Sequence, residues 1–166
     1  PCRFILLAAS NPCPCGYLGH PKRSCRCLPG AIFKYKKKIS GPITDRIDIN
    51  IDVPPVESSK MVENRKSESS NTVLGRVVNA FAKQSARFKN SRTVVNSQMT
   101  DAEIKKYCQM TREAEILLKS AIDKLFLSAR GYFKTIKISR TIADLNNQDE
   151  IKATDIAEAL QFRSSE

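Results

Sequence analysis

The hydrophobic pattern changes its period once along this chain, and that change limits the folds open to it. Before residue 58 the pattern is that of strands. Residues 4–9 are a continuous apolar run, as in a buried strand of a parallel sheet, and residues 47–53 alternate between apolar and polar side chains. After residue 70, apolar residues recur every three or four positions, which is typical of amphipathic helices. We therefore expect the end of an α/β sheet followed by an all-α bundle.

A polar segment separates these two parts. Residues 58–70 have no apolar rhythm and are expected to form a linker, so the chain divides into residues 1–57, the linker 58–70 and a helical part, residues 71–166. Thr100 and Glu103 predict a capping box at the start of a short helix. Other helices are predicted at about residues 31–39, 71–89, 112–126, 129–145 and 154–162.

Four of the six cysteines lie as two Cys-x-Cys pairs in a loop rich in proline and glycine: Cys13, Cys15, Cys25 and Cys27. Two close pairs of thiolates favour a tetrahedral zinc ion as a bound cofactor. Disulfides and reduced thiols without a metal remain alternatives at this point. His20 lies in the same loop, but four cysteines already complete a ligand set, so we leave it out.

The net charge of +11 is concentrated near the N-terminus. Residues 1–44 contain eight basic side chains and no acidic one, whereas the rest of the chain carries all 17 Asp and Glu residues. Such a surplus favours a polyanionic partner such as DNA, because neutralising phosphates releases bound counterions. A merely solvated basic face is the alternative. The candidate nucleic-acid contacts are Lys22, Arg23, Lys34, Lys36, Lys37 and Lys38.

Short stretches spread over nearly the whole chain resemble the Mg-chelatase-like AAA+ ATPases of the ComM group. In the first part these are FILLAASNPCPCG at residues 4–16 and ISGPITDRID at residues 39–48. In the second part they are ESS at 68–70, LSAR at 127–130, SRTIADL at 139–145 and EALQFR at 158–163. The cysteine pattern separates this group from true chelatase subunits. The resemblance implies the C-terminal part of an AAA+ core followed by a helical lid.

The resemblance also implies roles for side chains around ATP. Asn11 is similar to the sensor 1 residue, which orients the attacking water near the γ-phosphate. Arg46 resembles the arginine finger that acts on the nucleotide of a neighbouring subunit. Arg130 looks like sensor 2, a lid arginine that touches the γ-phosphate of its own subunit, and Arg140 is the second candidate for that contact.

The residues themselves leave simpler readings open for two of these side chains. The alternative for Asn11 is a plain asparagine that satisfies a turn at the end of its strand, a common task for this residue. Arg46 can instead pair with Asp45 or Asp48 at the surface.

As a family member, the chain is expected to work with ATP and Mg²⁺ in a ring, a hexamer by analogy, that drives DNA branch migration during recombination and natural transformation. None of its six glycines is followed by lysine, so the sequence contains no P-loop. We therefore expect a C-terminal fragment that is not catalytic alone. The alternatives are a magnesium chelatase ATPase subunit and a zinc-stapled nucleic-acid-binding module. With no run of 18 apolar residues, a soluble cytoplasmic protein without membrane contact is expected.

Overall fold

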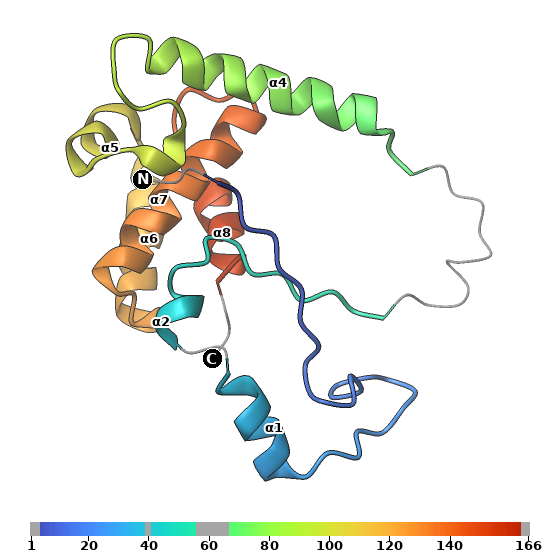
Figure 1. Cartoon of the computed structure of the whole chain (residues 1–166). Coiled ribbons are helices and arrows are strands. Elements are labelled where there is room, and N and C mark those ends of the chain that lie inside the picture. Colours follow the sequence, from blue (N-terminus) through green and yellow to red (C-terminus); the bar gives the residue numbers. More distant parts are fainter. Residues whose placement is uncertain (1–3, 39–40, 56–66, 164–166) are drawn as a thin grey trace. The chain divides into compact units, whose positions relative to one another are not determined.

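A computed structural model describes residues 4–38, 41–55 and 67–163, which are mostly helical (Figure 1). The chain separates into two compact units, and each unit takes two pieces of the sequence. Unit 1 is formed by Pro1–Arg46 and Asp52–Glu63, and unit 2 by Ile47–Ile51 and Asn64–Glu166. No described helix is long and apolar enough to cross a membrane.

Unit 1 carries a loop of turns followed by α1 (Pro29–Lys36) and α2 (Gly41–Thr44). Pro29 opens α1, where its missing N–H and fixed φ suit the first helical position. This confirms the predicted basic helix, although it begins and ends earlier than expected. No side chain of α1 is buried, so its basic residues face solvent.

Neither predicted strand forms. The side chains of residues 4–7 are 68 to 97% exposed, and residues 47–53 make no ladder. A strand needs a neighbour to bond its backbone, and within the described ranges the only pairing of this kind is a single bridge between Met110 and Ile151. The end of an α/β sheet is therefore not observed, and the first part of the chain lacks the predicted strand architecture.

Unit 2 is a helical bundle whose helices confirm the sequence prediction closely. It contains α4 (Ser70–Arg87), a 3₁₀ turn η1 (Asn96–Gln98), α5 (Asp101–Tyr107), α6 (Arg112–Leu125), α7 (Ala129–Leu145) and α8 (Ala153–Gln161). Hydroxyl groups of Ser69, Thr100, Thr111 and Ser128 cap the first turns of α4, α5, α6 and α7. The predicted capping box of Thr100 and Glu103 is present.

The core of unit 2 gathers around α7, which contacts α4, α5, η1 and α8, while α6 packs on α8. Ile136 and Ala143 of α7 are almost fully buried. The core is completed by apolar residues from the other elements, namely Phe88, Met99, Ile104, Cys108, Ala114, Leu118, Ile151 and Ile156. Because apolar burial is the main favourable contribution to folding, this cluster defines the stable part of the chain.

A buried polar network joins α4 to α7. The Asp144 carboxylate, with no exposed side-chain surface, accepts bonds of 2.5 and 2.7 Å from Arg87 and one of 2.8 Å from the amide of Asn96. Arg140 pairs with the same carboxylate at 3.0 Å. The backbone N–H of Asn96 in turn donates to the side chain of Gln84 on α4. Two cations thus share one anion in a site almost closed to water.

The short segment 47–51 belongs to unit 2 through hydrogen bonds at its two ends. Lys134 Nζ donates to the carbonyl of Ile47 at 2.8 Å, and the N–H of Asn50 donates to the carbonyl of Phe162 at 2.8 Å. This segment was predicted to be a strand, and it is instead tied to α7 and to the end of α8.

Candidate metal centre and nucleic-acid interface

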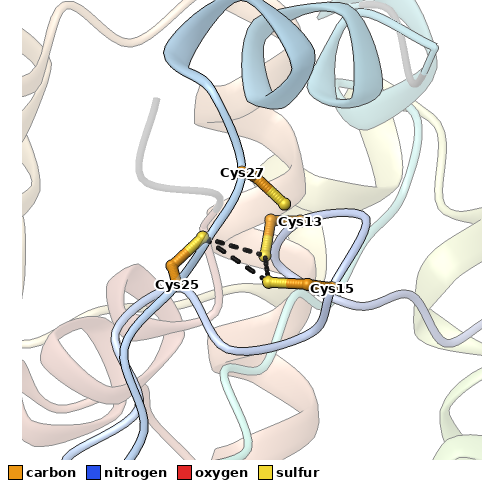
Figure 2. Close-up of side chains that lie close together, drawn as sticks. All are labelled: Cys13, Cys15, Cys25 and Cys27. Atoms are coloured by element: carbon orange, nitrogen blue, oxygen red, sulfur yellow. Dashed lines mark hydrogen bonds between the residues drawn. The ribbon is translucent and has the colours of Figure 1, made fainter.

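The predicted metal ligands converge in the loop before α1. Figure 2 shows the side chains of Cys13, Cys15, Cys25 and Cys27 turned toward one another. The Sγ atoms of Cys13 and Cys15 are 3.4 Å apart. The Sγ atom of Cys25 lies 3.7 Å from that of Cys13 and 3.6 Å from that of Cys15. All four sulfur atoms lie within 4.8 Å of one another.

Two turns fold the first pair of cysteines into this position. The N–H of Gly16 donates to the carbonyl of Cys13 at 3.0 Å, and the N–H of His20 donates to the carbonyl of Tyr17 at 3.1 Å. Gly16 and Gly19 have φ angles of +79° and +78°, which glycine adopts at little cost and most other residues do not. Consequently the chain reverses twice directly after Cys13.

The geometry fits a tetrahedral metal ion better than disulfides. A disulfide holds its sulfur atoms at about 2 Å, well short of the observed separations. Four thiolates around zinc at about 2.3 Å form a tetrahedron with edges of roughly 3.8 Å, close to the distances in this loop. The four cysteines therefore have the donor set and the spacing of a structural zinc site.

Backbone groups favour the thiolate form at Cys15, whereas burial and hydrogen bonds among the neighbouring thiols raise the pKa of Cys25 and of Cys27. N–H groups of Tyr17 and Arg26 donate to the sulfur of Cys15 and lower the pKa of its thiol to about 6. Cys13 is fully buried, while Cys15, Cys25 and Cys27 are half-buried. Cys108 lies apart from this cluster in the core of unit 2, as expected for a small apolar side chain, and burial raises its pKa to about 11.

The predicted nucleic-acid contacts are exposed in the same unit. Lys22 and Arg23 lie in the cysteine loop, Lys34 and Lys36 on α1, and Lys37 and Lys38 directly after it. Lys37 lies over the ring of Phe33 at 5.9 Å. No acidic residue lies within residues 1–44, so this stretch has no carboxylate of its own to neutralise its positive charge.

Sequence reasoning missed an aromatic and basic cluster beside the cysteines. The Arg23 guanidinium lies over the ring of Tyr17 at 5.2 Å and donates to its hydroxyl at 2.8 Å. The ring of His20 meets Tyr17 edge-on at 5.8 Å. A tyrosine within the basic cysteine loop was the available signal, but the residues approach one another only because of the two turns.

Two protein families match this chain, one in each half of the sequence. The family described as magnesium chelatase, subunit ChlI C-terminal, matches residues 67–163, which is more than half of the chain. The family described as magnesium chelatase, subunit ChlI, matches residues 1–61. The chain belongs to the magnesium chelatase ChlI family.

Individual relatives of this ChlI family chain come from several bacteria. The competence protein ComM of Haemophilus influenzae and a YifB protein of Salmonella typhimurium are each 35% identical to it over 166 residues. A YifB protein of Escherichia coli is 34% identical over 168 residues. These alignments include 99% of this chain and 31% of each relative. The chain thus spans about a third of the length of the curated relatives it matches.

The residues expected around ATP are divided between the two units of this ChlI family chain. Asn11 and Arg46 lie in unit 1 and Arg130 and Arg140 in unit 2. The side chain of Asn11 is exposed and lies next to Gly16, where a Cβ would come within 3.8 Å of it. Arg46 is exposed just after α2, and its N–H donates to the carbonyl of Ile43 at 2.9 Å.

The two candidate lid arginines differ in their surroundings. Arg130 is exposed in the first turn of α7, whereas Arg140 is 1% exposed and its three side-chain nitrogen atoms all donate within unit 2. Their acceptors are the Asp144 carboxylate and the carbonyls of Gln148 and Asp149. Arg140 therefore stabilises the bundle, and of the two side chains Arg130 is the accessible one.

Proposed function

We propose that this chain is the C-terminal part of a ring-forming AAA+ ATPase that acts on DNA, with the cysteine loop as a zinc-stabilised DNA-binding element. The observation that carries the proposal is the convergence of four thiols inside a basic segment free of acidic residues, in a chain of the ChlI family. Zinc would fix the loop, and the lysines and arginines around it would contact phosphates. The competence protein among its relatives supports DNA as the partner.

In this proposal the longer protein supplies the P-loop and the Mg²⁺-binding carboxylates, and the present residues complete the ATP site. Asn11 orients the attacking water as sensor 1, Arg46 reaches the nucleotide of the next subunit, and Arg130 contacts the γ-phosphate from the lid. Residues 4–9 become a strand once a neighbouring strand bonds their backbone. The working form is a ring, by analogy a hexamer, in the bacterial cytoplasm.

A magnesium chelatase ATPase subunit is the second candidate, because both matching families carry that description. Such a subunit acts on protein partners and has no need for a local excess of positive charge. The cysteine cluster within the basic segment favours DNA, so the two candidates differ in whether the chain binds nucleic acid.

DNA binding at several salt concentrations tests the proposal. We expect weak binding without sequence preference, with affinity falling steeply as salt rises, because each phosphate contact releases counterions. Reversing the charge of Lys36, Lys37 and Lys38 to Glu should flatten the dependence of log affinity on log salt. The matched control reverses three exposed lysines of unit 2, Lys105, Lys119 and Lys124, which changes the net charge equally. Equal slopes for the two triple variants would show that the lysines after Tyr35 form only a solvated face.

The role of Arg46 is tested in the longer protein that contains the P-loop. Arg46→Ala should leave ATP binding nearly unchanged and reduce hydrolysis by roughly 10³-fold, as for other arginine fingers. Mixing these subunits with P-loop-dead subunits should restore some turnover where an intact finger meets a live site. Hydrolysis at the wild-type rate would instead assign Arg46 to a surface ion pair.

A further inference from the structure

An open pocket lies beside the cysteine cluster in unit 1. It has a volume of about 400 Å³ and is lined by Cys15, Tyr17, Arg23, Ser24 and Arg26. Its lining residues carry an aromatic ring, two guanidinium groups and two hydroxyl groups, and none of them has a carboxylate. This chemistry suits a ligand that has both a flat ring and a negative charge.

The pocket side chains are held in place before any ligand arrives. The hydroxyl of Tyr17 accepts a bond from Arg23, whose guanidinium also covers the ring. His20 Nδ1 accepts the backbone N–H groups of Lys22 and Arg23, each at 3.1 Å, which fixes the turn that presents Arg23. Such preorganisation reduces the entropy lost on binding.

The cysteine cluster also positions the backbone that carries the pocket side chains. Cys15 forms part of the lining, and its sulfur lies 3.6 Å from that of Cys25, the residue between Ser24 and Arg26 of the pocket. A metal that holds Cys15 and Cys25 therefore holds the two backbone segments from which the pocket side chains project. The position of the ring depends on an intact loop.

We propose that this pocket binds one nucleotide of a single-stranded nucleic acid, with the base stacked on the Tyr17 and Arg23 layer and a backbone phosphate at Arg26. Lys22, exposed beside the pocket, extends the path for the backbone. Stacking needs an unpaired base, because the bases of a duplex already stack on one another. The proposal rests on the proposed function and assigns a strand preference to the same basic unit.

A polymer fits these observations better than a free nucleotide. Basic side chains continue from the pocket residues through Lys34 to Lys38, and a single nucleotide has no further phosphates to meet them. Aromatic rings set among basic residues are the general means by which proteins bind single strands without reading sequence. Single-stranded DNA and RNA share this chemistry, so the test compares both.

The test measures binding of zinc-loaded chain to fluorescent oligothymidylate and oligouridylate of about 15 nucleotides and to a duplex of the same length. Tyr17→Leu should weaken single-strand binding by roughly 10-fold or more, since one base–aromatic stack is worth about that much, and change duplex binding less than about 2-fold. Tyr17→Phe keeps the ring and loses only the bond from Arg23, so it should weaken single-strand binding less than Tyr17→Leu does. Tyr35→Leu is the matched control, because it removes a ring from the same basic unit outside the pocket.

A 2-aminopurine base placed in the strand gives a second readout. Its fluorescence should fall on binding to the wild-type chain and to Tyr17→Phe, but not on binding to Tyr17→Leu. If Tyr17→Leu loses zinc, Arg23→Lys serves in its place, because it keeps the charge and removes the planar group. A larger preference for the uridylate or the thymidylate strand assigns the pocket to RNA or to DNA.

The outcomes separate this inference from the proposed function. If the wild-type chain binds no nucleic acid, both fail. If it binds with a steep salt dependence but Tyr17→Leu and Arg23→Lys match wild type on single strands, the pocket proposal is wrong and the basic surface alone binds DNA. An equal loss on single strands and duplex would likewise refute base stacking, as would tight binding of free mononucleotide at the affinity of the oligomer.

Discussion

Removing the carboxylate of Asp144 should destabilise unit 2 more than removing any exposed charge. The side chain of Asp144 has 0% exposure, and its partners Arg87 and Arg140 are 13% and 1% exposed. In Asp144→Ala two guanidinium groups lose their shared anion, and the nearly buried one keeps only carbonyl acceptors. Breaking a buried ion pair in this way costs about 3–5 kcal/mol. The free energy of unfolding of a small protein falls by about 1–3 kcal/mol per molar urea, so the urea concentration at the unfolding midpoint should fall by at least roughly 1 M.

Urea unfolding followed by far-ultraviolet circular dichroism measures this effect, because unit 2 contains most of the described helix. Glu68→Ala is the control, since Glu68 pairs with Arg76 at 2.8 Å while their side chains are 43% and 55% exposed. That variant should lose less than about 1 kcal/mol. A loss in Asp144→Ala no greater than in Glu68→Ala would refute the reasoning that the network stabilises the bundle.

Three further predictions follow from the same structure. The chain prepared under reducing conditions should contain about one zinc per chain, and a strong chelator should loosen residues 12–30 while the far-ultraviolet signal of the bundle persists; a folded chain without metal would contradict the site. Glu103, whose pKa is lowered to about 2 by hydrogen bonds from Ser91, then Thr100 and Thr93, should contribute stability that is full above pH ~4.5 and is lost as pH falls toward 2, so Glu103→Gln should flatten this acid dependence in unfolding curves. Cys108, with a pKa raised by burial to about 11, should resist alkylation at neutral pH in the zinc-loaded native chain and react once urea unfolds it, which mass spectrometry can follow.

The bundle could be predicted from the sequence because its signals are local. Capping residues and a spacing of three to four fix where each helix begins and which way its apolar side chains point, as Thr100 and Glu103 show. The same pattern does not show what covers each face. Phe88 at the end of α4 is buried, whereas Val77 and Phe81 on the same helix are each 50% exposed.

The predictions that the structure does not confirm concern interactions between residues distant in the sequence. An apolar run such as residues 4–9 predicts a strand only if another strand lies beside it, and this cannot be read from the run itself. Likewise the position of Arg140 in the sequence does not show that the Asp144 carboxylate and two backbone carbonyls surround its guanidinium. The cysteine cluster was predictable because its ligands are close in sequence, but the stacking of Arg23 on Tyr17 depends on how the turns fold.

The C-terminal family match and the compact helical unit do not have the same boundaries, because the unit also includes segment 47–51. The C-terminal family begins at residue 67, yet the bundle holds a piece of chain that lies well before it, through the carbonyl of Ile47 and the N–H of Asn50. A protein cut at the family boundary would lose both bonds, each worth about 1 kcal/mol. Truncations of this chain that keep the bundle should therefore begin before Ile47, so that segment 47–51 stays available to bond α7 and the residue after α8.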